Sequence, residues 1–358
     1  MKIGIILHPF GEEKPGGLAR TIFEWTSALL RNDRENQYIV FLKNNLKSPP
    51  SLPNNPKIVA LDGGKFWLDN LKKFPELDVC IFQTPVLPPF YKPQKSAVIA
   101  QDFPYLHLKP QNIKERITNS FLFRYHQRSL NRAQAVIAVS EATKNDLLKF
   151  FKLPERKITV IHMGFKNICA VPKAHLDLPE SFFFYAGVIK ERKNILNLVK
   201  AFALFKKANP GVPEKLILAG KDEGDYAAEV KQFISKNNLT PAVAFLGYLN
   251  DYQLSFVYRR AKCFVFPSLV EGFGFPVLEA MACGVPVITS NIMGPAEIGR
   301  DAAFLINPAN PEEISAAMEK MTKDTDFRQS LIEKGLRRAK DFSWDKTALK
   351  TLEFLKTI

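Results

Sequence analysis

The sequence lacks long apolar runs and contains little cysteine. No stretch of roughly 18 consecutive apolar residues occurs, so the sequence predicts no membrane-spanning helix. The segment MKIGIILHPF at the N-terminus lacks the cleavage site of a signal peptide, and we expect a cytoplasmic location. The four cysteines, Cys80, Cys169, Cys263 and Cys283, show neither a C-x-x-C pair nor the spacing of a metal site. We interpret them as free thiols in the interior.

The fingerprint of a dinucleotide fold is also missing. The first predicted strand, Lys2–His8, is followed by GGLART instead of G-x-G-x-x-G. The second predicted strand, Tyr38–Leu42, ends in Lys43-Asn44 and not in an acidic residue. These absences argue against a nicotinamide-binding protein.

Acidic residues are too few to balance the basic ones. The chain has 50 Lys and Arg residues but 36 Asp and Glu residues, so its formal net charge is +14. This excess favours an anionic partner, such as a phosphate-bearing small molecule or an acidic lipid head group, although it also serves solubility. No recognised nucleic-acid-binding module accompanies the charge, so we expect no nucleic acid partner.

The most informative stretch is Cys263–Ser290, CFVFPSLVEGFGFPVLEAMACGVPVITS. It predicts a buried strand, a glycine-bearing loop, a short helix and a second buried strand. Pro276 suits the first turn of that helix, and Gly284 suits its end. The loop is therefore expected at the carboxyl edge of a parallel sheet, beside a helix N-terminus that favours a phosphate-like anion.

Two carboxylates flank the glycines of this loop. The loop reads Glu271-Gly272-Phe273-Gly274-Phe275, and Glu279 follows on the first turn of the predicted helix. Gly272 and Gly274 leave room for an anion to approach the backbone. Glu279 can bind the hydroxyls of a ribose, and Glu271 can bind those of a sugar ring. Either carboxylate alone is also explained by compensation of the helix dipole.

The segment EGFGFPVLEAMACGVPVITS resembles the E-x7-E signature of glycosyltransferase family 4, and similar motifs follow in the family's order along nearly the whole chain. The resemblance implies the GT-B fold, in which two doubly wound, Rossmann-like α/β domains face a cleft. It further implies that a sugar moves from a nucleotide-sugar donor with retention of configuration, without a metal ion or other cofactor.

A second group of candidate donor ligands follows the predicted strand Phe182–Tyr185. Gly187 precedes Arg192 and Lys193 at a helix start, where two cations suit a diphosphate whose charge grows as it departs. A solvated basic loop is the alternative. Many family members have an arginine directly after the glycine, whereas this R-K-N variant resembles the group 1 mannosyltransferases of polysaccharide and O-antigen assembly. Lys221 follows a further predicted strand, at an edge that lies near the nucleotide in the family.

The N-terminal half supplies candidates for the other side of the reaction. Gly16 and Gly17 resemble the family's N-terminal glycine loop, which faces the donor phosphates and the transferred sugar. Gln101 and Asp102 stand where the family commonly has a His-Asp pair. Glutamine cannot take up a proton at neutral pH. Asp102 and His107 therefore remain the candidates for activating or orienting the acceptor, with Gln101 beside them.

The segment Asn112–Arg132 predicts a helix on which cations alternate with apolar and aromatic residues. Such a helix indicates contact with an anionic membrane surface or a phosphate-rich acceptor, or else it packs on the sheet with a solvated basic face. The proline-dense segment Thr84–Lys95 is similarly either an acceptor loop or a packed connection.

The α/β pattern ends and restarts once along the chain. We therefore expect an acceptor-side domain over residues 1–168 and a nucleotide-sugar-binding domain over residues 169–341. The resemblance implies that the C-terminal helix, residues 342–358, packs back on the first domain.

The resemblance, together with these features, implies a metal-independent hexosyltransferase. The first candidate donor is GDP-mannose, and the acceptor is a growing glycan or a lipid-linked saccharide at the inner face of a membrane. Another donor, such as UDP-glucose or UDP-N-acetylglucosamine, remains open, and so does a catalytically degenerate nucleotide-sugar-binding protein. Epimerases and phosphorylases share the fold, but the ordered motifs argue against both.

Overall fold

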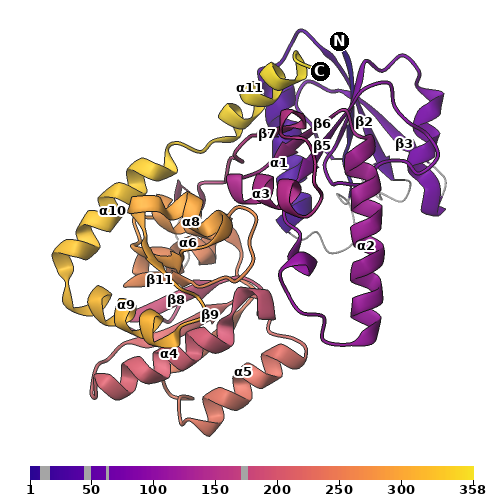
Figure 1. Ribbon diagram of the computed structural model, residues 1–358. Coiled ribbons are helices and arrows are strands. Elements are labelled where there is room, and N and C mark those ends of the chain that lie inside the picture. The colour runs from indigo at the N-terminus through magenta and orange to yellow at the C-terminus, as the bar shows by residue number, and fades with distance from the viewer. Residues whose placement is uncertain (9–16, 44–49, 62–63, 171–175) are drawn as a thin grey trace. The chain divides into compact units, whose positions relative to one another are not determined.

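The computed structural model describes residues 1–8, 17–43, 50–61, 64–170 and 176–358 (Figure 1). The chain forms two compact units. Unit 1 comprises Met1–Gly164 together with Phe342–Ile358, and unit 2 comprises Phe165–Asp341. Each unit is a parallel sheet with helices packed around it, which is the doubly wound arrangement that the sequence predicts.

Unit 1 is built on a parallel sheet with the strand order β3-β2-β1-β4-β5-β6-β7. Its strands read as short, continuous apolar runs, because a parallel sheet is covered on both faces. All residues of β4, β5 and β6, for example, are buried. The strands are β1 (Lys2–Ile6), β2 (Gln37–Lys43), β3 (Lys57–Leu61), β4 (Val79–Phe82), β5 (Ser96–Ala100), β6 (Ala135–Ala138) and β7 (Ile158–Val160).

The helices of unit 1 begin where the sequence places capping residues. Ser140 accepts a hydrogen bond from the main-chain nitrogen of Thr143, and Asn112 accepts one from that of Glu115. The α-helices are α1 (Gly17–Asn32), α2 (Ile113–Arg132), α3 (Glu141–Lys149) and α11 (Trp344–Leu355). Short 3₁₀ segments are η1 (Gly64–Lys73), η2 (Pro104–Leu106) and η3 (Glu155–Lys157).

Helix α11, from the end of the chain, is part of unit 1 and packs on α1. The indole nitrogen of Trp25 donates to Thr351 Oγ1 at 3.1 Å in the buried interface between these helices. Thr347 Oγ1 donates to the main-chain oxygen of His162 at 2.8 Å. A side chain at Gly164 would collide with the main chain of Trp344, whose nitrogen lies 2.1 Å from the position of a Cβ. The C-terminal segment therefore completes the core of the first unit.

Unit 2 is built on a second parallel sheet, with the strand order β10-β9-β8-β11-β12-β13. Helices α4 and α9 pack against each other, and α7 packs against α10. The strands are β8 (Phe182–Ala186), β9 (Lys215–Ala219), β10 (Val243–Gly247), β11 (Cys263–Phe266), β12 (Val287–Ser290) and β13 (Phe304–Ile306). The helices are α4 (Ile195–Ala208), α5 (Asp225–Lys236), α6 (Asp251–Arg260), α7 (Phe275–Ala282), α8 (Met293–Gly299), α9 (Pro311–Lys323) and α10 (Thr325–Ala339), with the 3₁₀ segments η4 (Ile168–Ala170), η5 (Glu191–Lys193) and η6 (Arg300–Ala302).

The interpretation of all four cysteines as free thiols is wrong for two of them. Cys169 and Cys283 form a disulfide with a Cα–Cα distance of 5.3 Å, whereas Cys80 and Cys263 are free and buried. The bonded pair is separated by 114 residues, so no local spacing could reveal it. Tertiary packing brings η4 against α7 and the two thiols together.

Candidate donor site

The candidate site of unit 2 lies where the order of its strands reverses. Strand β8 has β9 on one side and β11 on the other, so the loops that follow β8 and β11 leave the same edge of the sheet as neighbours. Ligands of doubly wound sheets bind outside the carboxyl ends of the strands at such a reversal. The first of these loops carries Arg192 and Lys193, and the second carries Glu271.

Two glycines allow the loops after β8 and β9 to approach closely. Gly187 has φ +148°, and a Cβ there would lie 2.6 Å from the hydroxyl of Tyr185. Gly220 has φ +134°, and its Cβ would lie 2.0 Å from the oxygen of Gly187. Lys221 follows directly, with its main-chain oxygen bonded to the nitrogen of Ile189 at 2.9 Å. The Lys221 side chain is exposed at this edge, as a secondary phosphate ligand requires.

The loop after β8 is fixed to the loop after β11 by main-chain contacts. The oxygen of Arg192 accepts hydrogen bonds from the nitrogens of Leu269, at 2.8 Å, and Val270, at 3.3 Å. Asn194 is buried in a left-handed conformation, with φ 62°. Its side-chain amide donates to the oxygen of Pro267 at 3.1 Å and to that of Pro308 at 2.6 Å. The asparagine of the R-K-N sequence therefore acts as a structural anchor, which leaves the two cations to face the site.

Glu271 joins the two cations into one cluster. Its Oε2 lies 3.1 Å from Nη1 of Arg192 and also forms an ion pair with Nζ of Lys193. Lys193 lies over the ring of Phe266, 4.7 Å from its centroid, and its side chain is 9% exposed, whereas the side chain of Arg192 is 31% exposed. Arg192 is thus the cation more open to a ligand. We call Arg192, Lys193 and Glu271 the cation cluster.

Burial alone would raise the pKa of Glu271, but the charges of Lys193 and Arg192 and their hydrogen bonds outweigh this effect. The pKa of Glu271 therefore lies below its ordinary value, and the carboxylate stays ionised at neutral pH. Sequence reasoning placed Glu271 near the sugar and the cations near the diphosphate, but did not connect them.

The glycine loop enters α7 as the sequence predicts. Gly274 caps the helix with φ 111°, a conformation that favours glycine, and Pro276 lies in the first turn. Phe273 is buried at 3% exposure, so it anchors the loop and is not a free ligand. Phe275 packs on it with the two rings tilted and their centroids 5.1 Å apart. Gly272 and Gly274 are buried as well, whereas Glu271 and Phe275 at the two ends of the loop are half-buried.

A glycine that the sequence analysis passed over supports this loop. Gly294 lies in helix α8, and Pro295 follows it in the first turn, where a proline is tolerated. The main-chain nitrogen of Gly294 donates to the main-chain oxygen of Glu271 at 3.1 Å. A Cβ at Gly294 would lie 2.6 Å from the carbonyl of Gly272. Only a comparison of distant segments could find this contact.

Glu279 lies farther into the helix than expected. It is the fifth residue of α7, so it belongs to the second turn and not to the first. This position takes the carboxylate away from the free N–H groups of the helix start, where dipole compensation acts. The hydroxyl of the buried Tyr258 lies 3.5 Å from Glu279 Oε2, at the limit of a hydrogen bond. Glu279 is half-buried and stays a candidate ribose ligand.

The acceptor-side candidates lie at the carboxyl ends of strands β1 and β5 in unit 1. Gly16 lies outside the described residues, and Gly17 is the first residue of α1, with open space where a Cβ would be. Gln101 and Asp102 directly follow β5 and are half-buried. Within the described parts of the chain, the buried side-chain nitrogen of Gln101 has no hydrogen-bond partner.

His107 is held by an acidic partner that sequence reasoning missed. Its Nε2 lies 2.8 Å from Oδ2 of Asp146, on α3. Next to it, the hydroxyl of Tyr105 contacts Nδ1 of His126 at 2.9 Å, and burial lowers the pKa of His126 to about 4. The loop after β5 is therefore tied to both α2 and α3.

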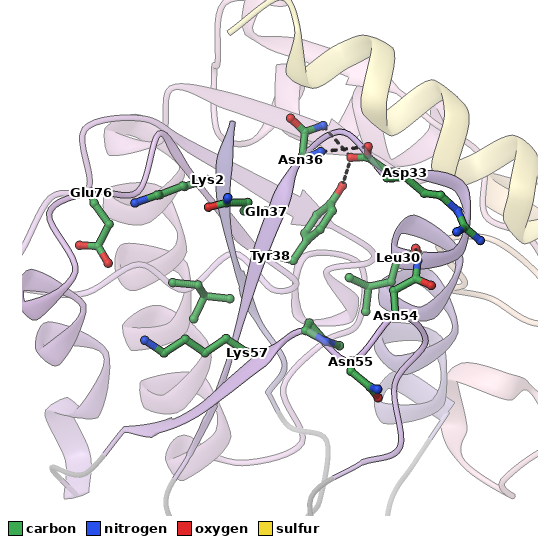
Figure 2. Close-up of a pocket in the computed structure, with 13 residues that line it drawn as sticks. Lys2, Leu30, Asp33, Asn36, Gln37, Tyr38, Asn54, Asn55, Lys57 and Glu76 are labelled. Carbon is green, nitrogen blue, oxygen red and sulfur yellow. Dashed lines mark hydrogen bonds between the residues drawn. The ribbon is translucent and has the colours of Figure 1, made fainter.

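A pocket of about 790 Å³ lies at the other, amino edge of the unit 1 sheet (Figure 2). It is lined by the first residues of β1, β2 and β3 and by the end of α1. Figure 2 shows the hydroxyl of Tyr38 and the amide of Asn36 pointing at the carboxylate of Asp33, and both groups donate a hydrogen bond to it. None of the predicted donor or acceptor residues is among the described residues that line it. The pocket is therefore distinct from the candidate site.

The acidic residues that follow β9, Asp222, Glu223 and Asp225, do not form a metal site. Asp222 pairs with Lys231, with 2.6 Å between Oδ2 and Nζ. In the described ranges, no group of three or more His, Cys, Asp or Glu side chains has a geometry suited to a metal ion.

Both halves of the sequence match known family models. Residues 171–338 match glycosyl transferases group 1, and residues 15–166 match glycosyltransferase family 4. The O-antigen chain mannosyltransferase B of Escherichia coli is 28% identical over 76% of this chain and 73% of that protein. The serotype-specific mannosyltransferase WbdA of Escherichia coli is 31% identical over 62% of this chain, but the match spans 28% of that protein.

The fold also matches solved structures. The HepE protein of Anabaena, in complex with UDP and glucose, superposes with a TM-score of 0.76 over 100% of both chains, at 20% identity. At that identity the likeness concerns the fold, which is GT-B. The two family models together account for both units. The cation cluster and the glycine loop lie within residues 171–338, the part that matches glycosyl transferases group 1. The chain belongs to glycosyltransferase family 4, with a group 1 domain, and is a glycosyltransferase of the GT-B type.

Proposed function

We propose that this protein transfers mannose from GDP-mannose, with retention of configuration, to a growing glycan or a lipid-linked saccharide. The observation that carries the proposal is the cation cluster, which sets two cations and an ionised carboxylate beside a glycine loop. The names of two relatives, both mannosyltransferases, support the choice of sugar.

The cluster suits a leaving nucleoside diphosphate. As the sugar departs, negative charge accumulates on the diphosphate, and fixed cations stabilise that charge more strongly than they stabilise the bound donor. Arg192 is the more exposed cation and would bind the phosphate oxygens directly, whereas the buried Lys193 would act mainly through its charge. Glu271 holds both cations in place and would also accept hydrogen bonds from sugar hydroxyls.

The remaining donor contacts follow from the loop. The main chain of Gly272–Phe275 would bind the sugar and phosphates, and Glu279 would bind the ribose. Gly187 and Lys221 border the same edge of the sheet. We further propose Gly16 and Gly17 as donor contacts from unit 1, and Gln101, Asp102 and His107 as acceptor contacts.

The proposed reaction needs no divalent metal, because Arg192 and Lys193 supply the positive charge that a metal ion would otherwise provide. The chemistry expected of this chain is then positioning and electrostatic stabilisation by its own side chains. No other cofactor is part of the proposal.

A second donor is supported by a different observation. A structure with the same fold, HepE of Anabaena, is in complex with UDP and glucose. The cation cluster would bind the diphosphate of UDP-glucose or UDP-N-acetylglucosamine equally well. A degenerate protein that binds a nucleotide-sugar without transferring it is the non-catalytic alternative.

A thermal-shift and hydrolysis screen tests the proposal without knowledge of the acceptor. GDP-mannose, UDP-glucose and UDP-N-acetylglucosamine are each added to the full chain, with and without EDTA. At a hundredfold excess over Kd, a donor stabilises the fold by about 2.7 kcal/mol, which a melting curve resolves. A shift with GDP-mannose that survives EDTA supports the proposal. A shift with a UDP-sugar alone would identify that UDP-sugar as the donor in place of GDP-mannose. No shift with any of the three would overturn the donor site.

A lipid-linked acceptor would require the enzyme to act at a membrane surface. We propose that the protein contacts the anionic surface of a membrane peripherally, which its net charge of +14 supports. Throughout the described ranges, the helices are either too short or too polar to cross a bilayer. The proposed contact is therefore one at the surface.

A further inference from the structure

Helix α2 leaves its first half uncovered. It has 20 residues, but only Ser129 and Leu130, in its last turn, are buried. Leu130 joins the core of unit 1 and Phe123 packs against that core, whereas the first half of the helix extends from the sheet (Figure 1). An ordinary surface helix buries one apolar stripe along its whole length. The alternative in which α2 simply packs on the sheet therefore holds for its second half, where Phe123 packs against the core and His126 contacts Tyr105.

The uncovered part carries large apolar side chains. Ile113 is 72% exposed, Ile117 is 65% exposed and Phe121 is 66% exposed. They are spaced four residues apart, so they lie one above the other on a single side of the helix. Tyr125 continues the stripe and stacks on Phe121, with ring centroids 6.3 Å apart. A continuous exposed apolar stripe of this kind marks an interaction surface.

Cations are interleaved with this stripe. Arg124 and Arg128 follow Phe121 by three and seven residues, which places them on the same side, and both are exposed. The helix carries five basic residues but one acidic residue, Glu115. That carboxylate accepts a hydrogen bond from the main-chain nitrogen of Gln111 at 2.6 Å, at the start of the helix. The apolar side is thus strongly basic.

An aromatic loop extends the surface at the end of α2 nearer the sheet. Arg132 donates to the main-chain oxygens of Pro88, at 2.7 Å, and Tyr91, at 3.0 Å. These bonds fix the proline-dense loop so that Phe90 is 77% exposed. Phe90 contacts Phe66 edgewise, with centroids 5.4 Å apart. The loop is therefore packed on α2 at its base and presents an aromatic side chain to solvent.

We propose that this surface, formed by Ile113, Ile117, Phe121, Arg124, Arg128 and Phe90, binds the surface of an anionic lipid bilayer. We call it the α2 surface. Its charge is complementary to phospholipid head groups, and its apolar side chains match the region just beneath them. The partner groove for an amphipathic helix is apolar, and the interleaved arginines would have to lose their hydration inside it. At a bilayer the same arginines remain at the level of the phosphates.

The inference rests on the proposed function in one respect, because it assigns the site of the proposed membrane contact. Binding to lipid itself requires neither donor nor acceptor. The two proposals can therefore fail separately, one in a vesicle assay and the other in a donor melting assay.

The test is co-sedimentation of the full chain with vesicles of phosphatidylcholine alone and of phosphatidylcholine mixed with phosphatidylglycerol. We expect binding to the mixed vesicles that weakens as salt is added. Replacing each arginine with glutamine, as Arg124→Gln or Arg128→Gln, should weaken binding by about fivefold. The double variant Ile117→Ser, Phe121→Ser should weaken it by at least about tenfold.

Matched controls separate the α2 surface from general charge and hydrophobicity. Arg260→Gln, on an exposed position of α6, and Leu349→Ser, at a leucine of α11 that is 50% exposed, should bind vesicles like the unchanged protein. All variants should keep the donor-induced melting shift, because the cation cluster lies in unit 2. Equal binding to neutral vesicles, unchanged binding of the α2 variants, or a dimer that those variants dissociate would each overturn the proposal.

Discussion

Arg192 Nη1 lies 3.1 Å from Oε2 of Glu271, although the two residues are 79 positions apart. The contact exists because the strands that precede them, β8 and β11, are neighbours in the sheet. Lys193 binds the same oxygen from the buried side. The carboxylate therefore sets the positions of both cations before any ligand arrives, and such preorganisation is the main source of electrostatic catalysis.

Removal of Arg192, the half-buried and more accessible of the two cations, should impair transfer much more than folding. In Arg192→Ala, the main-chain bonds to Leu269 and Val270 remain, so the loop keeps its path. We expect kcat to fall by about a hundredfold to a thousandfold, because one stabilising charge is lost from the transition state. Steady-state kinetics with the preferred donor measure the change. Lys190→Ala, at an exposed position of the same loop, is the matched control and should keep most activity.

Glu271 should make stability depend on pH in a defined direction. Its pKa is lowered in the folded protein, since the effect of Lys193 and Arg192 outweighs that of burial. Its stabilising contribution is therefore complete above its ordinary pKa of 4.5 and is lost as the pH falls through the lower folded value. At neutral pH, Glu271→Gln should cost about 3–5 kcal/mol, because Lys193 stays buried without its partner.

Urea unfolding of the two proteins across a pH series measures this effect. The difference in unfolding free energy between the unchanged protein and Glu271→Gln should shrink at acid pH. A difference that stays constant from neutral to acid pH would contradict the ion pairs. Glu155→Gln, which removes an exposed partner of Lys144, is the control and should change stability little at any pH.

The disulfide should stabilise unit 2. Cys169 and Cys283 close a loop with a sequence separation of 114, which restricts the unfolded chain. We expect the double variant Cys169→Ser, Cys283→Ser to lose about 2–4 kcal/mol relative to the oxidised protein in urea unfolding. Dithiothreitol should destabilise the unchanged protein by a similar amount and leave the double variant unaffected. If the reductant has no effect on the unchanged protein, the pair does not form a disulfide in solution.

The sequence predicts the parts of the site that are continuous in the chain. The strand, glycine loop, helix and strand of Cys263–Ser290 follow from apolar runs, one proline and one glycine, and the structure confirms them. The R-K-N segment is visible for the same reason. The ion pair between Arg192 and Glu271 cannot be predicted in this way, because it depends on which strands are neighbours in the sheet. The partner of His107 is hidden likewise, since Asp146 lies 39 residues away on another helix.

The exposed side of α2 shows a second limit. The pattern of Asn112–Arg132 correctly predicts a helix, because cations and apolar residues recur at helical spacing. It does not reveal which side of the helix meets the sheet. Only the burial of Leu130 and the exposure of Ile117 decide that question.

Gly294 provides the sharpest test of the glycine loop, since its role is invisible in the sequence. In Gly294→Ala, the new Cβ would lie 2.6 Å from the carbonyl of Gly272, so the loop must move. The main-chain nitrogen of Gly294 also donates to the main-chain oxygen of Glu271. A shift of this main chain would carry the Glu271 carboxylate with it. A displacement of this kind should lower kcat/KM by about a hundredfold, while crowding costs about 1–3 kcal/mol of stability.

Kinetics and urea unfolding of the same preparation separate these two effects. Gly17→Ala is the control for stability, because its Cβ would meet nothing within 4 Å, and its unfolding free energy should stay unchanged. If Gly294→Ala unfolds like the unchanged protein and also turns over at the same rate, the loop adapts to the methyl group without moving Glu271. The close approach of Gly294 to Gly272 would then not be what fixes the position of Glu271.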